Sequence, residues 1–170
     1  CVVAEGLIVY TTVSDPNTAR QVMANMFREE FNPRAINSKK YRERLEKALT
    51  YRDGIEATVR VSRVGVLRDH LQNTADSVTD WVANIFRLAR RLDAYERDKV
   101  IEQDLRSVPL AIKNLEERLQ QEEDEAVQQH IQEAIASKKA HQQNLEKLQN
   151  MMEKAEFQLE QTLSDLGTIY

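Results

Sequence analysis

The clearest pattern of apolar positions lies near the end of the sequence. Between Leu145 and Ile169, apolar residues recur at alternating steps of three and four, which places them along one side of a helix. The stripe consists of Leu145, Leu148, Met152, Ala155, Leu159, Thr162, Leu166 and Ile169, and all except the threonine are interpreted as a coiled-coil seam. This seam predicts lengthwise packing on another helix, which belongs to this chain, to a second copy or to a different protein.

A second stripe precedes the first and is broader. It steps by four and three through Leu71, Ala75, Val78, Val82, Ile85, Ala89 and Leu92, and it is widened by Trp81, Leu88 and Tyr95. Charged residues cover the opposite side. An amphipathic helix is therefore predicted here as well.

The first 52 residues predict three further elements. Residues 1–13 are apolar and β-branched, which favours a strand or an extended segment. Residues 14–31 predict a short helix, because Asp15 is a suitable N-cap and Pro16 suits the first helical position. A new helix is predicted to start at Asn37 or Ser38, followed by apolar residues at helical spacing: Tyr41, Leu45, Ala48 and Leu49.

The long helices are expected to fold back at an elbow near residues 107–109. The residue before a proline avoids the helical conformation, and proline begins helices well. Residues 38–106 and 110–170 would then form arms of about 100 and 90 Å at 1.5 Å per residue. In this register Leu145 lies near Leu71, Lys138 near Asp80 and His141 near Asp76.

Two stretches admit alternative interpretations. Residues 120–126 contain no large apolar side chain until the stripe resumes, but Glu and Gln are good helix formers, so a continuous helix is favoured over an acidic turn. Residues 57–67 alternate valines as a strand does, and Gly65 weakens a helix. A helix is still favoured, because no turn signal separates this stretch from the helix that follows.

Composition supports an all-α fold. Only four Gly and three Pro interrupt 170 residues, 31% of which are charged and 6% aromatic. The predicted fold is a long antiparallel helical hairpin or coiled-coil bundle with a short N-terminal helix and an extended N-terminal segment. Residues 1–37 are expected to pack on the rod near Trp81, and residues 38–170 to form the hairpin.

The cellular compartment is inferred from the cysteine content and from the lack of a long apolar run. Cys1 is the only cysteine, so no internal disulfide is expected, and no run approaches the roughly 18 to 20 apolar residues that cross a bilayer. We therefore expect a cytoplasmic protein, peripheral to the membrane if it meets one.

Enzymatic chemistry is not expected from this sequence. It has no phosphate-binding glycine loop and no Gly-x-Ser-x-Gly elbow, and His70, His130 and His141 lie far apart. The acidic run 122–125 is interpreted as a solvated face. No cofactor, metal ion or small-molecule substrate is predicted.

Charge is distributed unevenly along the chain. Residues 34–68 carry ten Lys or Arg against four Asp or Glu, whereas residues 107–170 carry six against twelve. The basic stretch comprises Arg34, Lys39, Lys40, Arg42, Arg44, Lys47, Arg52, Arg60, Arg63 and Arg68. It could bind an anionic membrane surface or nucleic acid. Pairing with the acidic part of the chain, within one copy or between copies, is the favoured alternative.

These patterns favour a non-enzymatic helical scaffold or protein-interaction module, associated with a membrane surface. In architecture alone, the predicted hairpin resembles bacterial membrane-remodelling and coiled-coil scaffold proteins. A nucleic-acid-associated coiled coil and a helical sensor or signalling domain are the alternatives. Because the apolar stripes are wider than one partner helix covers, self-association is expected, most simply as a dimer.

Overall fold

The computed structural model describes residues 26–61 and 65–170, with backbone alone from 60 to 76. Every regular element in this described part is helical, which confirms the predicted all-α fold with long packed helices. After a helical turn at residues 26–30, the elements are η1 (Pro33–Ala35), α3 (Lys39–Val61), α4 (Gly65–Glu96), α5 (Lys99–Gln121) and α6 (Glu125–Ile169). The predictions for residues 1–13, and for most of the helix 14–31, lie outside the described residues.

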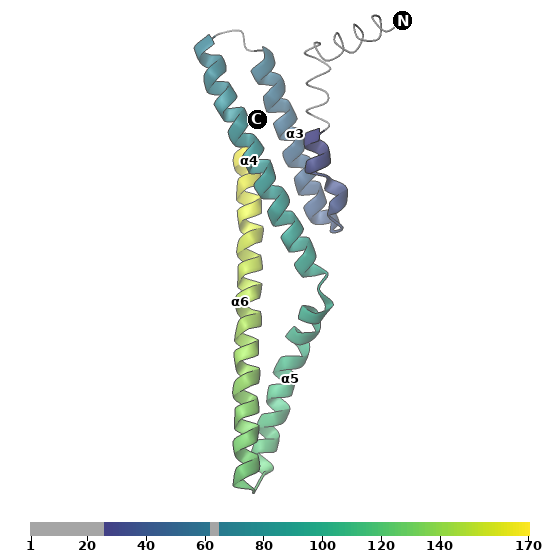
Figure 1. Cartoon of the computed structure of the whole chain (residues 1–170), viewed down its shortest axis with the longest axis vertical. Helices are drawn as coiled ribbons and strands as arrows, with labels where there is room; N and C mark the ends of the chain where they lie inside the picture. Colours follow the sequence, from purple (N-terminus) through teal and green to yellow (C-terminus); the bar gives the residue numbers. More distant parts are fainter. Residues whose placement is uncertain (1–25, 62–64) are drawn as a thin grey trace, which may run out of the picture.

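The helices form a bundle at one end and a two-helix hairpin at the other (Figure 1). In the bundle, α3 and α4 lie beside each other and both contact the second half of α6. α5 continues away from the bundle in the general direction of α4, and the first half of α6 returns along it. The 45 residues of α6 correspond to about 68 Å at 1.5 Å per residue. One continuous helix therefore carries both parts.

The bundle has one contiguous apolar core. Leu45 of α3, Ile85 of α4 and Leu159 of α6 are fully buried within it. Phe31 and Ile36, which precede α3, cover the side of this core, and the Phe31 ring meets Phe86 edge-on at 5.5 Å between centroids. Three helices therefore close around apolar faces that none of them could bury alone.

The hairpin has its own smaller core. Val108 and Ile112 of α5 pack with Leu145 of α6, with Ile101 and Leu105 partly buried beside them. Among the described residues, the clusters of the bundle and the hairpin share no member. The hairpin is thus a two-helix arm with a separate and thinner core.

The predicted elbow at residues 107–109 is wrong. α5 runs from Lys99 to Gln121 with Pro109 in its interior. Pro109 is exposed, whereas its helical neighbours Val108 and Ile112 are only 2% and 6% exposed. Burial of this apolar stripe against α6 outweighs the one backbone hydrogen bond that proline removes.

The chain instead reverses at residues 122–124, where the continuous-helix prediction is wrong and the acidic turn is right. Asp124 caps α6, since its carboxylate accepts hydrogen bonds from the backbone N–H of Ala126 at 2.8 Å and Val127 at 3.1 Å. Gln128 Nε2 donates to the Glu122 carbonyl at 2.6 Å. A good N-cap satisfies amides that a continuous helix would have bonded internally, so helix propensity alone could not decide this stretch.

The first predicted arm is also not one helix. It is divided between α3 and α4, which lie side by side, and α5, which starts after a break at residues 97–98. Asp98 caps α5 by accepting from Val100 N at 2.9 Å and Ile101 N at 3.2 Å. The residues that join α3 to α4, 62–64, lie outside the described part.

The shift of the elbow changes the register of the hairpin. Leu145 packs on Val108 and Ile112 of α5, so the register predicted from an elbow at residues 107–109 is wrong. His141, predicted to lie near Asp76, is 3.3 Å from Asp104 of α5, and Lys138, predicted to lie near Asp80, is exposed. His141 therefore does have a polar partner, as predicted, but that partner is a residue of α5.

The position of Pro109 gives a direct test of this register. Because it lies within α5, Pro109→Ala should stabilise the hairpin by about 1 to 3 kcal/mol and increase helicity. Circular dichroism and urea unfolding would measure both effects. If residue 109 were at an elbow, alanine would instead leave stability unchanged or reduce it.

Candidate interaction surfaces

The basic stretch is largely part of the architecture. Lys40 and Arg44 of α3 form ion pairs with Glu156 and Glu160 of α6. Both pairs join residues 116 positions apart, so α3 and α6 run parallel here. This pairing within the chain is the kind of complementarity favoured by the charge distribution.

Arg52 connects α3 to the segment before it. Its side chain is buried, its guanidinium lies 3.8 Å from the centroid of the Phe27 ring, and it pairs with Glu56. Arg28 reaches the same helix and pairs with Asp53. Arg52 is therefore a packing residue and not part of an open cationic surface.

The other members of the basic stretch differ in their surroundings. Arg42 donates to the carbonyls of Ile36 at 3.1 Å and Asn37 at 2.9 Å, which fixes the chain before α3. Arg34, Lys39 and Lys47 are exposed, and Lys47 lies 5.6 Å from the centroid of the Tyr51 ring. The side chains of Arg60, Arg63 and Arg68 lie outside the description. Binding of an anionic surface through this stretch stays a prediction.

A charge swap distinguishes architecture from an external role. Arg44→Glu should lower the free energy of unfolding by about 1 kcal/mol, because the new carboxylate faces Glu160. Adding Glu160→Arg should recover most of that loss, whereas Glu43→Arg, on the exposed side of α3, should not. Urea unfolding of the four proteins would measure the coupling, and its absence would contradict a structural role.

A buried carboxylate joins α3 to α4. Asp93 is 2% exposed. Its Oδ1 accepts from the backbone N–H of Ser38 at 2.7 Å and of Asn37 at 3.1 Å, and its Oδ2 accepts from Arg97 at 2.9 Å. Asp93 thus satisfies backbone donors at the start of α3 from a different helix, a role that local capping rules cannot identify.

The surroundings of Asp93, where α4 meets the start of α3, favour its charged form. Burial tends to raise the pKa of Asp93, but the hydrogen bonds from Ser38 and Asn37, together with Arg97, outweigh it and hold the pKa below its usual value. Nearby, the Tyr41 hydroxyl donates to Glu96 at 2.9 Å, and burial together with this bond raises the tyrosine pKa. The buried polar groups of Asp93 and Tyr41 are thus hydrogen-bonded within the protein, which indicates a structural role.

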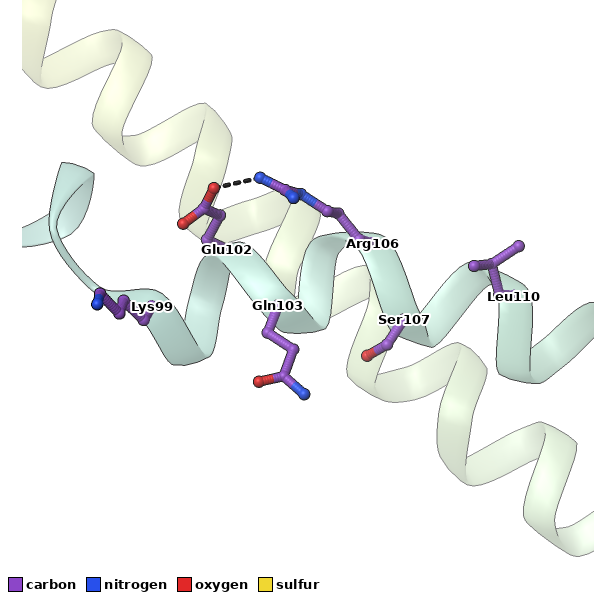
Figure 2. Close-up of a pocket in the computed structure, with 6 residues that line it drawn as sticks. All are labelled: Lys99, Glu102, Gln103, Arg106, Ser107 and Leu110. Carbon is purple, nitrogen blue, oxygen red and sulfur yellow. Dashed lines mark hydrogen bonds and ion pairs between the residues drawn. The ribbon is translucent and has the colours of Figure 1, made fainter.

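The outward face of α5 carries a shallow hollow (Figure 2). All its lining residues come from this one helix: Lys99, Glu102, Gln103, Arg106, Ser107 and Leu110. Glu102 and Arg106 form an ion pair across one helical turn, and Leu110 is 61% exposed. A mixed helix surface of this kind can contact another protein, but it does not enclose a small molecule.

The predicted seam of α6 is distributed over both cores. Leu145 lies in the hairpin core, and Met152, Ala155, Leu159 and Leu166 are buried in the bundle. Leu148 and Thr162 are half-buried, and Ile169 is 40% exposed. Leu163, which the heptad places beside the seam, is buried, whereas Phe157 is 67% exposed.

Apolar side chains recur in rows along α4 and α6, and several of them are only half-buried. Trp81, Leu88 and Tyr95 recur every seven residues along α4 and pack only partly against the core. Leu148, Ala155, Thr162 and Ile169 follow the same seven-residue spacing on α6, where Leu148 and Thr162 are half-buried, Ala155 is buried in the core and Ile169 is exposed. We call these two rows the α4–α6 face. Its partial exposure contrasts with the α3–α6 side, which ion pairs cover.

The described residues contain no group of three or more His, Cys, Asp or Glu placed to hold a metal ion. No described helix is both long enough and apolar enough to span a bilayer. Comparison with protein-family models, curated proteins and solved structures found no match to this chain.

Proposed function

We propose that this protein is a non-enzymatic helical scaffold that works through protein–protein contacts, including self-association. The observation that carries the proposal is the extended arrangement on α6. One 45-residue helix holds a three-helix bundle at one end and a two-helix arm at the other. Such a form presents long helix faces at separate places, which suits a spacer or assembly element.

The polar groups are consistent with this role. The most buried charged network, around Asp93, is occupied by backbone amides and Arg97, so no group in it is left to act on a substrate. Two cations of α3, Lys40 and Arg44, form ion pairs with carboxylates of α6. What remains accessible is mainly helix surface, with large apolar side chains such as Val100 and Leu110 on α5 and Met151 on α6.

The proposal is tested by measuring mass and length together. Light scattering coupled to small-angle X-ray scattering should give a dimer mass at tens of micromolar and an elongated particle, with α6 alone accounting for about 68 Å. A compact particle would contradict the scaffold. An elongated monomer would leave the scaffold in place and remove self-association.

Association with a membrane surface or with nucleic acid is tested separately. Sedimentation with anionic liposomes and gel shift with random duplex DNA would be run at about 50 and 200 mM salt, since binding by charge weakens steeply over that range. Because Lys40, Arg44 and Arg52 already have partners, weak binding at most is expected. Tight DNA binding would favour the nucleic-acid alternative.

A further inference from the structure

We propose that Tyr51 of α3 and Tyr170 of α6 form an oxidative crosslinking site, at which a one-electron oxidant joins the two rings by a carbon–carbon bond. The site goes beyond the proposed scaffold role and does not depend on it, since it requires only the contact between α3 and α6. Its consequence is a redox-sensitive latch, because oxidation converts a noncovalent contact at the end of α6 into a covalent one.

The two tyrosine rings lie against each other. Their centroids are 5.3 Å apart, and their planes are inclined by 38°. The other ring contacts among the described residues join phenylalanines only. Tyr41 is buried with its hydroxyl bonded to Glu96, and Tyr95 is half-buried on α4. Among the described tyrosines, one pair is therefore placed to couple.

Two glycines make room for this contact. The offset of 116 residues that relates the ion-paired side chains of α3 and α6 also places Tyr51 beside Gly167. A Cβ on Gly167 would lie 3.3 Å from the Tyr51 ring. The same offset places Gly54 beside Tyr170, where a Cβ on Gly54 would overlap the tyrosine ring. Each ring therefore packs on a stretch of the opposite helix that carries no side chain, which brings the two rings together.

Both rings are accessible to a small oxidant. Tyr170 is 67% exposed, and Tyr51 is half-buried beside a hollow of about 310 Å³ between α3 and α6. Lys47 and Tyr51 line this hollow on α3, and Ser164 and Gly167 line it on α6. Solvent therefore reaches the Tyr170 ring directly and the Tyr51 ring through the hollow.

The coupling balances with hydrogen peroxide as the oxidant and a haem peroxidase as the catalyst. Each tyrosine gives up one electron and its hydroxyl proton and becomes a neutral phenoxyl radical. The two radicals form one bond between ring carbons ortho to the oxygens. Each ring then regains its aromatic form as the proton on the bonded carbon moves to the phenolic oxygen. The peroxide takes up the two electrons and two protons and becomes two water molecules, so the linked protein is lighter by two hydrogen atoms.

Proximity favours this pair over crosslinks between molecules. Radicals on rings that are already in contact couple without diffusing together, so their effective concentration far exceeds that of the protein in solution. The fraction of linked protein should therefore stay constant between about 1 and 20 µM protein. A fraction that rises in proportion to protein concentration would show coupling between copies and would overturn the site.

Mass spectrometry identifies the crosslink directly. After treatment with hydrogen peroxide and a haem peroxidase, a tryptic digest should contain residues 48–52 joined to residues 155–170, with two hydrogen atoms missing. Tyr51→Phe and Tyr170→Phe should each abolish the linked peptide, whereas Tyr95→Phe should retain it. A digest in which the linked peptides come only from other tyrosines would contradict the proposal.

Gly54→Ala tests the geometry while keeping both tyrosines. The new methyl group displaces the Tyr170 ring, so the yield of linked peptide should fall at least fivefold, whereas the higher helix propensity of alanine keeps α3 folded. Glu46→Ala, an exposed substitution on another side of α3, should leave the yield unchanged. Circular dichroism would show that both variants fold. An undiminished yield in Gly54→Ala would overturn the role of this contact in the coupling.

The latch is tested on the linked protein. The bond joins residues 119 positions apart and restricts the unfolded chain, so the urea midpoint of the bundle should rise. Hydrogen exchange in residues 163–170 should slow at least tenfold, with α5 unchanged. Tyr170→Phe, treated in the same way, carries the same oxidised methionines and controls for their effect. Linked protein with an unchanged midpoint and unchanged exchange would overturn the latch, and it would leave the proposed scaffold untouched.

Discussion

Replacing Asp93 by alanine is expected to lower the free energy of unfolding by about 3 kcal/mol. The substitution removes the acceptor of the Ser38 and Asn37 amides, and it also removes the partner of the largely exposed Arg97. Unsatisfied buried donors cost about 1 to 3 kcal/mol each, and solvent can reach only some of them. Urea unfolding followed by circular dichroism would measure the loss. Asp80→Ala, at an exposed position of the same helix, should change stability by less than about 0.5 kcal/mol.

The same carboxylate makes stability depend on pH. The pKa of Asp93 is lower in the folded state than in the unfolded chain, so its contribution is fully present above about pH 4 and is lost as pH falls below that value. Asp93→Asn keeps the shape but cannot ionise, and it should remove this part of the acid sensitivity. An unchanged difference between the original protein and Asp93→Asn from pH 7 to pH 2.5 would show that Asp93 does not titrate with folding.

The helices could be predicted because their signals are local. Apolar repeats at three and four residues define one side of a helix whatever lies opposite, and the stripes around Ile85 and Leu159 therefore mark residues that the bundle buries. The turns depend on competition between elements. Pro109 is a strong break locally, but the packing of Val108 and Ile112 on α6 keeps α5 continuous through it.

For the candidate surfaces, the sequence likewise predicted local features but not the contacts between distant parts of the chain. The basic stretch was evident from composition, but the partners of Lys40 and Arg44 lie 116 residues away, beyond the reach of any local rule. Asn37 or Ser38 was expected to cap α3 by itself. The carboxylate of Asp93, 55 residues after Ser38, accepts these amides instead, and no sequence signal pointed to it.

Leu159→Ala is expected to destabilise the bundle by about 3 kcal/mol, whereas Ile112→Ala should destabilise the hairpin by about 2 kcal/mol. Leu159 of α6 is fully buried in the core that α6 forms with α3 and α4, so its truncation leaves a cavity in the larger core. Ile112 belongs to the separate hairpin cluster, whose few members can adjust more easily.

The location of the two effects matters more than their size. Because the clusters share no described residue, we expect the hairpin to open at a lower free energy than the bundle does. Hydrogen exchange read by mass spectrometry should show that Ile112→Ala increases exchange in α5 and the first half of α6 and leaves α3 and α4 unchanged. Leu159→Ala should raise exchange throughout the bundle. If Ile112→Ala accelerated exchange equally in α3, the 45-residue α6 would couple both ends into one cooperative unit, and the scaffold would act as a rigid rod rather than as a bundle bearing a separable arm.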